Sequence, residues 1–117
     1  MVDDDEMNRE VLQIQLEGVD MLVDTAESGD IAIAKAKEMS YSAIFMDMQM
    51  PQMDGMEATS RIRELSEYGD VPIIVITANV FSEDKEKCFN AGMNDFLSKP
   101  FNPDALFETL FIWLEKN

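Results

Sequence analysis

The sequence predicts a single α/β domain in which helices cover both faces of a parallel, doubly wound sheet. Short apolar runs alternate with longer amphipathic stretches along the chain, which is the pattern of repeated strand–helix–strand units. The 117 residues, of which 46% are hydrophobic, are enough for one domain with a real core and too few for a second. Because no linker, low-complexity tract or internal repeat interrupts this pattern, we expect residues 1–117 to form one domain.

The expected strands are short and strongly apolar. The clearest spans residues 71–76 and is apolar throughout, as expected for a strand that is buried on both faces of a sheet. Pro72 must lie at its beginning, because proline cannot donate a ladder hydrogen bond. Further strands are predicted at three other apolar runs, residues 21–23, 43–46 and 96–97.

Amphipathic stretches between the strands predict five helices, at residues 7–17, 29–39, 55–66, 82–91 and from 103 onward. Gly92 directly follows the fourth and is a good helix stop. Asn102 and Pro103 combine an N-cap with a proline at the first helical position of the last helix. Strands and helices alternate along the chain, and right-handed crossovers between them give three layers, with the sheet between two layers of helices. Ligands of such folds bind at the carboxyl ends of the strands.

The composition excludes several functions. The chain contains no histidine, which rules out Ser/His or Cys/His catalysis, histidine-ligated zinc and a phosphohistidine of its own. A net charge of −15 would be repelled by a phosphate backbone, so we expect no direct nucleic-acid binding. The one cysteine, Cys88, lies on a predicted helix, where we expect a half-buried, inert thiol that suits a reducing compartment. No apolar run approaches the roughly 18 residues of a membrane span, and the N-terminus lacks the basic segment of a signal peptide, so we expect a cytoplasmic protein without membrane contact.

Residues that suit phosphoryl chemistry follow three of the predicted strands, and a further group follows Met1-Val2, which we interpret as the end of a first strand. They are Asp3-Asp4-Asp5, Asp47, Thr77-Ala78 and Ser98-Lys99-Pro100. Parallel strands bring these ends to one edge, where carboxylate oxygens suit Mg²⁺ and a lysine supplies a charge for a phosphate oxygen. Each residue alone is more often a solvated strand end or a helix cap. Together they predict a phosphoryl-transfer site, in which positioning and charge neutralisation carry most of the catalysis.

The same residues carry a resemblance to the receiver domains of bacterial two-component response regulators. Residues 47–55 (Asp-Met-Gln-Met-Pro-Gln-Met-Asp-Gly) resemble their phosphorylation loop, and residues 2–5 resemble their acidic motif. Residues 76–78 (Ile-Thr-Ala) and 98–101 (Ser-Lys-Pro-Phe) are similar to two further motifs of the family. The separations of 30 residues from Asp47 to Thr77 and of 22 from Thr77 to Lys99 also agree. The resemblance covers essentially the whole chain and implies a flavodoxin-like sheet of five strands in the order 2-1-3-4-5.

The resemblance implies an acceptor and a metal site. Asp47 would accept a phosphoryl group as an acyl phosphate. Asp4, Asp47 and the backbone carbonyl of Gln49 would bind Mg²⁺ directly, with Mn²⁺ as a substitute, and Asp3 would act through a coordinated water. Asp5 matches no role in the family, and we interpret it as a helix cap.

The resemblance further implies residues that hold the phosphate and respond to it. Thr77, the backbone N–H of Ala78 and Lys99 would bind phosphate oxygens. Thr77 and Phe96 would form a switch, in which the threonine moves toward the phosphate and the aromatic ring turns inward behind it. This switch would alter the face formed by the helix at 82–91, the strand at 96–97 and the last helix.

Two amide side chains are expected to tune hydrolysis of the acyl phosphate. By resemblance, Gln49 and Asn79 would flank the path of the attacking water. Because a neutral amide is a poor general base, we expect slow to moderate loss of the phosphoryl group, which suits a relay.

Such a domain would take part in a two-component phosphorelay. The expected partner is a histidine kinase or a histidine phosphotransfer protein, and a dimer would form through the switch face. Residues 8–10, 88–96 and 110–114 resemble receivers of hybrid histidine kinases, and a stand-alone response regulator is the other expectation. The domain would catalyse only its own phosphorylation and dephosphorylation, so we do not expect an enzyme, although a parent hybrid protein could be a histidine kinase.

Other interpretations fit less well. A haloacid-dehalogenase-like phosphatase needs a second acid two residues after the nucleophile, where this chain has Gln49. A pseudo-receiver would have lost the acceptor or the lysine, and both are present. An EF-hand at residues 47–55 fails because Pro51 occupies a position that must supply a side-chain oxygen. One departure from the family is that only Met1 and Val2 precede the acidic run, so we expect a truncated first strand that leaves its neighbours without ladder partners.

Overall fold

The computed structural model describes residues 1–19, 21–48, 53, 55–65, 68–69, 71–77, 85–98 and 103–115. Within these ranges the elements are α1 (Glu6–Glu17), α2 (Gly29–Glu38), β1 (Ile44–Asp47), α3 (Gly55–Arg63), β2 (Ile73–Thr77), α4 (Lys85–Ala91), β3 (Asp95–Ser98) and α5 (Pro103–Glu115). All five predicted helices are therefore confirmed, with α3 ending three residues early. The predicted cap at Asn102 and the predicted helical residues 82–84 lie outside the described residues.

The sheet is parallel and has the predicted order. β1, β2 and β3 lie side by side in that order. Val2 forms parallel bridges with Met46 of β1 on one side and with Ala26 on the other. Across the sheet the chain thus runs from Ala26 to Val2, β1, β2 and β3, which corresponds to the order 2-1-3-4-5. Among the described residues, however, the first two positions in this order, Ala26 and Val2, are single bridges rather than full strands.

The strand predicted at residues 21–23 was wrong. The pairing falls instead at Ala26, and the Leu22 side chain is fully exposed. Next to this bridge, the ammonium group of Met1 donates to the carbonyl of Asp24 (3.0 Å). Among the described residues, none forms a ladder with residues 21–23.

The expectation of a truncated first strand is confirmed, since Val2 forms only single bridges, but the neighbouring residues that lie beside it are paired. Val2 donates to the carbonyl of Phe45 (2.8 Å), and its own carbonyl accepts from the N–H of Asp47 (2.8 Å). On the other side, Asp3 donates to the carbonyl of Ala26 (3.1 Å). Three residues are therefore enough to satisfy both neighbours where they lie beside them.

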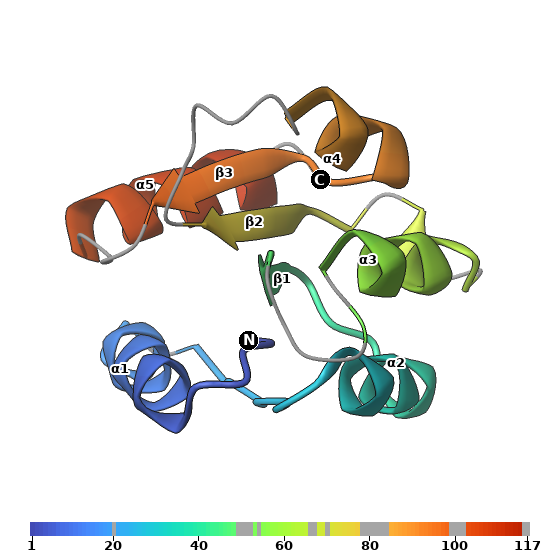
Figure 1. Cartoon of the computed structure of the whole chain (residues 1–117). Coiled ribbons are helices and arrows are strands. Elements are labelled where there is room, and N and C mark those ends of the chain that lie inside the picture. The colour runs from blue at the N-terminus through green and yellow to red at the C-terminus, as the bar shows by residue number, and fades with distance from the viewer. Residues whose placement is uncertain are drawn as a thin grey trace.

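Alternate strand residues face two different helical layers. One cluster joins Ile44, Met46, Ile73 and Val75 to α2, α3 and α4, and the other joins Phe45, Ile74, Ile76 and Leu97 to α1 and α5. Figure 1 shows α1 and α5 on one side of the sheet and the remaining three helices on the other. This is the predicted three-layer arrangement. Cys88 of α4 is 1% exposed in the first cluster, so its thiol is more deeply buried than expected.

Polar caps and one glycine set the helix ends. The carboxylate of Asp5 accepts a hydrogen bond from the N–H of Met7 (2.9 Å), which confirms its interpretation as the cap of α1. At the end of α4, Gly92 has a φ of 109°. The N–H groups of Gly92 and Met93 donate to the carbonyls of Phe89 and Cys88, both at 3.0 Å, which is a Schellman motif.

We expect Gly92→Ala to destabilise the fold by about 1–2 kcal/mol, because a side chain is strained at this φ. Its Cβ would also lie 2.8 Å from Cγ of Arg63, whose guanidinium is held by two hydrogen bonds to the Gly92 carbonyl (3.0 and 2.7 Å). Urea denaturation measures the loss. Gly69→Ala is the matched control, since its Cβ would meet nothing within 4 Å, and should change the unfolding free energy by less than about 0.5 kcal/mol. Equal losses in both variants would contradict this account.

Candidate functional site

Three carboxylates meet at the edge of the sheet formed by the carboxyl ends of the strands. One oxygen each from Asp3, Asp4 and Asp47 lies within 4.8 Å of the other two. Asp3 and Asp47 are 0% and 3% exposed, whereas Asp4 is exposed to solvent. Carboxylates this close repel one another, and a divalent cation relieves the repulsion. An all-oxygen donor set with one member open to water fits Mg²⁺, which prefers carboxylates and retains water ligands.

Backbone pairing places these acids together. Because the N–H of Asp47 donates to the carbonyl of Val2 (2.8 Å), the end of β1 lies beside the start of the acidic run. The start of α3 packs against the same point, since a Cβ on Gly55 would lie 2.4 Å from the backbone oxygen of Asp47. Only a glycine allows α3 to approach this closely. Gly55 belongs to the motif at residues 47–55, but its packing role could not be predicted from the motif alone.

The two N-terminal acids are held in different ways. Among the described residues, the N–H of Asp5 donates to one oxygen of the Asp3 carboxylate (2.9 Å) and the side-chain amide of Asn8 donates to the other (3.2 Å). Within the described part of the chain, no residue donates a hydrogen bond to the exposed carboxylate of Asp4. Asp4 is thus open to an external ligand, whereas the oxygens of Asp3 are engaged by the protein. Sequence analysis missed the contact of Asn8, whose only signal was its position in the first turn of the helix after the acids.

Of the other residues predicted to bind or respond to phosphate, the structure describes Thr77 and Phe96. Thr77 is the last residue of β2 and is half-buried, and the register pairs it with Ser98 while Asp47 pairs with Ile76. Thr77 and Asp47 therefore end neighbouring strands at the same edge. The other predicted contributors, Gln49, Ala78, Asn79 and Lys99, lie outside the described residues.

Phe96, the predicted switch aromatic, lies on β3 and contacts α4. Its ring meets that of Phe89 edge to face, with centroids 5.3 Å apart and an interplanar angle of 83°. The preceding residue, Asp95, accepts a hydrogen bond from the indole of Trp113 on α5 (2.8 Å). Two successive residues of β3 therefore contact the two helices of the predicted switch face.

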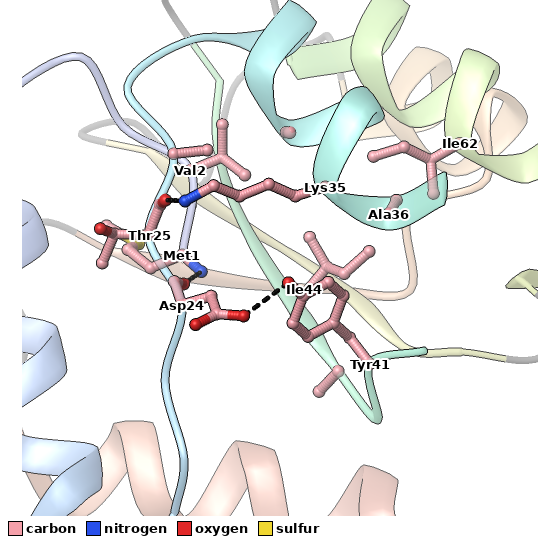
Figure 2. Close-up of a pocket in the computed structure, with 12 residues that line it drawn as sticks. Met1, Val2, Asp24, Thr25, Lys35, Ala36, Tyr41, Ile44 and Ile62 are labelled. Atoms are coloured by element: carbon pink, nitrogen blue, oxygen red, sulfur yellow. Dashed lines mark hydrogen bonds between the residues drawn. The ribbon is translucent and has the colours of Figure 1, made fainter. Parts of the chain in front are cut away.

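A small cavity lies away from the acids, near the start of β1 (Figure 2). Its volume is about 40 Å³, and it is partly open to solvent. Polar groups gather along one wall, where Tyr41 donates to the carboxylate of Asp24 (2.6 Å) and Lys35 donates to the carbonyl of Thr25. Burial raises the pKa of Tyr41 to about 12, helped by the bond to Asp24, and burial lowers the pKa of the Met1 amino group to about 6. The cavity lies apart from the three carboxylates, and we assign it no part in phosphoryl chemistry.

Comparison with known proteins identifies the family. The family model for the response regulator receiver domain matches residues 1–111. Hybrid signal transduction histidine kinase L of Dictyostelium discoideum is 47% identical over 116 residues, which cover 94% of this chain and 7% of that protein. The histidine-protein kinase BarA of Escherichia coli is 38% identical over 109 residues, which cover 93% of this chain and 12% of that protein. The chain thus spans only a small part of the length of these relatives.

Solved structures agree with the family match. Chemotaxis protein CheY4 of Vibrio cholerae superposes with a TM-score of 0.92 at 34% identity, covering 95% of this chain and 92% of that one. The receiver domain of a sensor histidine kinase from Pseudomonas aeruginosa superposes with a TM-score of 0.90 at 38% identity, covering 97% and 93%. That structure holds a magnesium ion in its active-site cleft.

The chain therefore belongs to the response regulator receiver domain family. It is a receiver domain of two-component phosphorelay signalling, of the kind found in hybrid histidine kinases and response regulators, with the flavodoxin-like fold. Receivers of hybrid kinases work with histidine kinase or phosphotransfer partners, and the receiver itself is a phosphoacceptor. No helix in the described ranges is long and apolar enough to cross a bilayer.

Proposed function

We propose that Asp47 is the phosphoacceptor of this receiver and that Asp3, Asp4 and Asp47 hold the Mg²⁺ on which phosphorylation depends. The convergence of these three carboxylates within 4.8 Å is the observation that carries the proposal. The magnesium in the cleft of the Pseudomonas receiver, at 38% identity, supports the choice of metal. Mn²⁺ has similar ligand preferences and is proposed as a substitute.

The hydrogen bonding of Asp3 and Asp4 supports different roles for them in binding the metal. Asp4 is exposed and open, so we assign it a direct bond to the metal, together with Asp47 and the backbone carbonyl of Gln49. Both oxygens of Asp3 already accept protein hydrogen bonds, so we assign it a contact through a metal-bound water. When bound, the cation would neutralise charge on the transferring phosphoryl group.

The proposed transfer is a direct displacement at phosphorus. A carboxylate oxygen of Asp47 forms the new P–O bond as the P–N bond of the donor phosphohistidine breaks, and the electron pair returns to the imidazole. Thr77 ends the neighbouring strand, which suits a hydroxyl that donates to a phosphate oxygen. The N–H of Ala78 and the ammonium group of Lys99 are proposed to hold the other oxygens. Asp47 is buried, so its acyl phosphate would be partly shielded from water.

Substitutions of Asp47 and Asp4 should distinguish the residue that accepts the phosphoryl group from a residue that only binds Mg²⁺. Asp47→Asn should abolish the adduct that acetyl phosphate forms in the presence of Mg²⁺, since the nucleophilic carboxylate is gone; intact-mass spectrometry detects it. Asp4→Asn should weaken Mg²⁺ binding at least about 10-fold in calorimetry, because a direct ligand loses its charge. Asp30→Asn, an exposed acid in the first turn of α2, is the matched control and should change neither result. A full adduct on Asp47→Asn would refute the assignment.

We also propose that phosphorylation switches the face formed by α4, β3 and α5. The new phosphate oxygens would draw Thr77 toward them, and Phe96 would turn inward and lose its present contact with Phe89. Phe89, Phe111 and Ile112 are 50%, 40% and 46% exposed on the two helices of this face. Exposed apolar groups of this size support a dimer through the face.

A beryllofluoride adduct, which stands in for the phosphoryl group, tests the switch by NMR. We expect resonances of Phe96, Phe89 and Trp113 to shift together with those of the acids, and sedimentation to show any accompanying dimer. Shifts confined to the acids and Thr77 would contradict the proposal. Leu22, exposed on the far side of the domain, serves as an internal control that should not respond.

The lifetime of the acyl phosphate is proposed to depend on Gln49 and Asn79. Neither amide can act as a strong base for the attacking water, so slow to moderate hydrolysis is expected. Asn79→Glu should shorten the lifetime by supplying a base, while leaving the Mg²⁺ affinity nearly unchanged. Time-resolved decay of the phosphorylated protein measures the lifetime of the acyl phosphate. A lifetime of a few seconds in the unaltered chain would exclude slow to moderate hydrolysis.

The remaining proposals concern the scope of the domain. The family match to residues 1–111 supports a single receiver domain over residues 1–117. We propose that it acts in the cytoplasm, on a phosphohistidine partner, with no direct nucleic-acid contact, since the net charge is −15. We further propose that it catalyses only reactions of its own Asp47, and that any kinase activity belongs to a longer hybrid protein.

A further inference from the structure

The first turn of α1 reaches back to the acidic run through two consecutive side chains. The amide of Asn8 donates to one carboxylate oxygen of Asp3 (3.2 Å), and the guanidinium of Arg9 donates to the backbone carbonyl of Asp3 (2.7 Å). Both contacts return across the cap of the helix to a residue that is 0% exposed. Neither side chain is needed to cap α1, because Asp5 already performs that role.

The contact of Asn8 fixes the plane of the Asp3 carboxylate. The N–H of Asp5 donates to Oδ1 (2.9 Å) and Asn8 donates to Oδ2, so the two oxygens are held separately. Rotation about the Cβ–Cγ bond of Asp3 would break at least one of these bonds. Hydrogen bonds to an ionised acceptor are stronger than those to a neutral one, and they fix its direction as well.

The contact of Arg9 acts on the neighbouring acid. The carbonyl that it binds belongs to the peptide unit joining Asp3 to Asp4, and a peptide unit is planar. On the other side of Asp3, its N–H is fixed by the bond to the carbonyl of Ala26 (3.1 Å). The backbone that leads into Asp4 is thus held on both sides of Asp3. Among the described contacts, Arg9 binds this backbone and not the Asp4 carboxylate. Arg9 can therefore orient Asp4 through the peptide plane.

We propose that Asn8 and Arg9 are positioning residues of the metal site: Asn8 orients the carboxylate of Asp3, and Arg9 orients the peptide that presents Asp4. This inference rests on the proposed function, since it assumes that the acids bind Mg²⁺. Partners that orient metal ligands contribute to affinity because they remove the cost of ordering those ligands when the metal binds. α1 is then part of the metal site, in addition to covering one face of the sheet.

Calorimetric titration of the 117-residue chain with Mg²⁺ tests the role of Asn8. Asn8→Ala should weaken binding about 10-fold, as is typical for partners of metal ligands. Gln13→Ala removes an amide from the same helix, where it bonds only to the exposed Glu17 (3.4 Å), and should leave the affinity unchanged. Thermal unfolding of each variant verifies that it is folded. An unchanged affinity in folded Asn8→Ala would overturn the proposal.

A double-mutant cycle distinguishes positioning from a general structural effect. If Asn8 acts through Asp3, then Asn8→Ala should change the affinity by no more than about twofold in an Asp3→Asn background. A loss of the same size in both backgrounds would overturn the proposed route. The NMR signals of the Asn8 side-chain amide provide a second readout: they should shift with the same midpoint as Mg²⁺ binding, while those of Gln13 should not. If the Asn8 side-chain amide signals did not shift on Mg²⁺ binding, the proposal would also be overturned.

Arg9→Lys tests the second residue while conserving its charge. Lysine keeps the electrostatic potential but loses the guanidinium geometry, so a weaker Mg²⁺ affinity reports positioning rather than charge. Arg61→Lys on α3, where Arg61 pairs with Glu57 (3.1 Å) at the surface, is the matched control. Equal affinities for the Arg9 and Arg61 variants would overturn the role of Arg9. If instead the unaltered chain binds no Mg²⁺, it is the proposed function that fails and not this inference alone.

Discussion

The hydrogen-bond ladder between Val2 and β1 is the constraint on which the site depends. Two bonds of 2.8 Å, from Val2 to Phe45 and from Asp47 to Val2, join segments that are more than 40 residues apart in the chain. They place Asp3 and Asp47 side by side with both side chains buried, against the repulsion of their charges. The N–H of Asp5 and the side-chain amide of Asn8 donate to the Asp3 carboxylate and offset part of that repulsion. A site assembled in this way is stable only as part of the completed sheet.

The amino ends and the carboxyl ends of the strands differ in the polar groups that gather there. At the amino-end edge, the guanidinium of Arg63 donates to the carbonyl of Gly92 and to the side chain of Asn94 (2.6 Å), and the same Asn94 oxygen accepts from the N–H of Ile73 (2.8 Å). These bonds tie α3, β2 and the turn before β3 into one network in which the donors and acceptors match. At the opposite edge the acids of like charge converge. A closed hydrogen-bond network at the amino ends of the strands thus accompanies a gathering of carboxylates at their carboxyl ends, which is the arrangement expected where a cation binds.

The grouping of Asp3, Asp4 and Asp47 could be predicted from sequence because it follows from strand direction alone. Parallel strands bring their carboxyl ends to one edge, whatever their exact lengths. The strand placed at residues 21–23 failed because its apolar composition says nothing about whether a partner backbone lies alongside it. The contacts of Asn8 and Arg9 could not be predicted because they depend on the angle at which α1 leaves the acidic run. That angle is set by the Asp5 cap and by packing of Leu12 and Leu16 in the core, which no local pattern specifies.

Trp113 is the only tryptophan in the chain, and its indole donates a hydrogen bond to Asp95, the residue that precedes Phe96 in β3. Indole emission depends strongly on the hydrogen bond of its nitrogen and on nearby charge. The molecule therefore carries a natural optical probe at the point where β3 meets α5. A rearrangement of β3 against α5 that breaks this hydrogen bond would thus change the intrinsic fluorescence of the unlabelled protein.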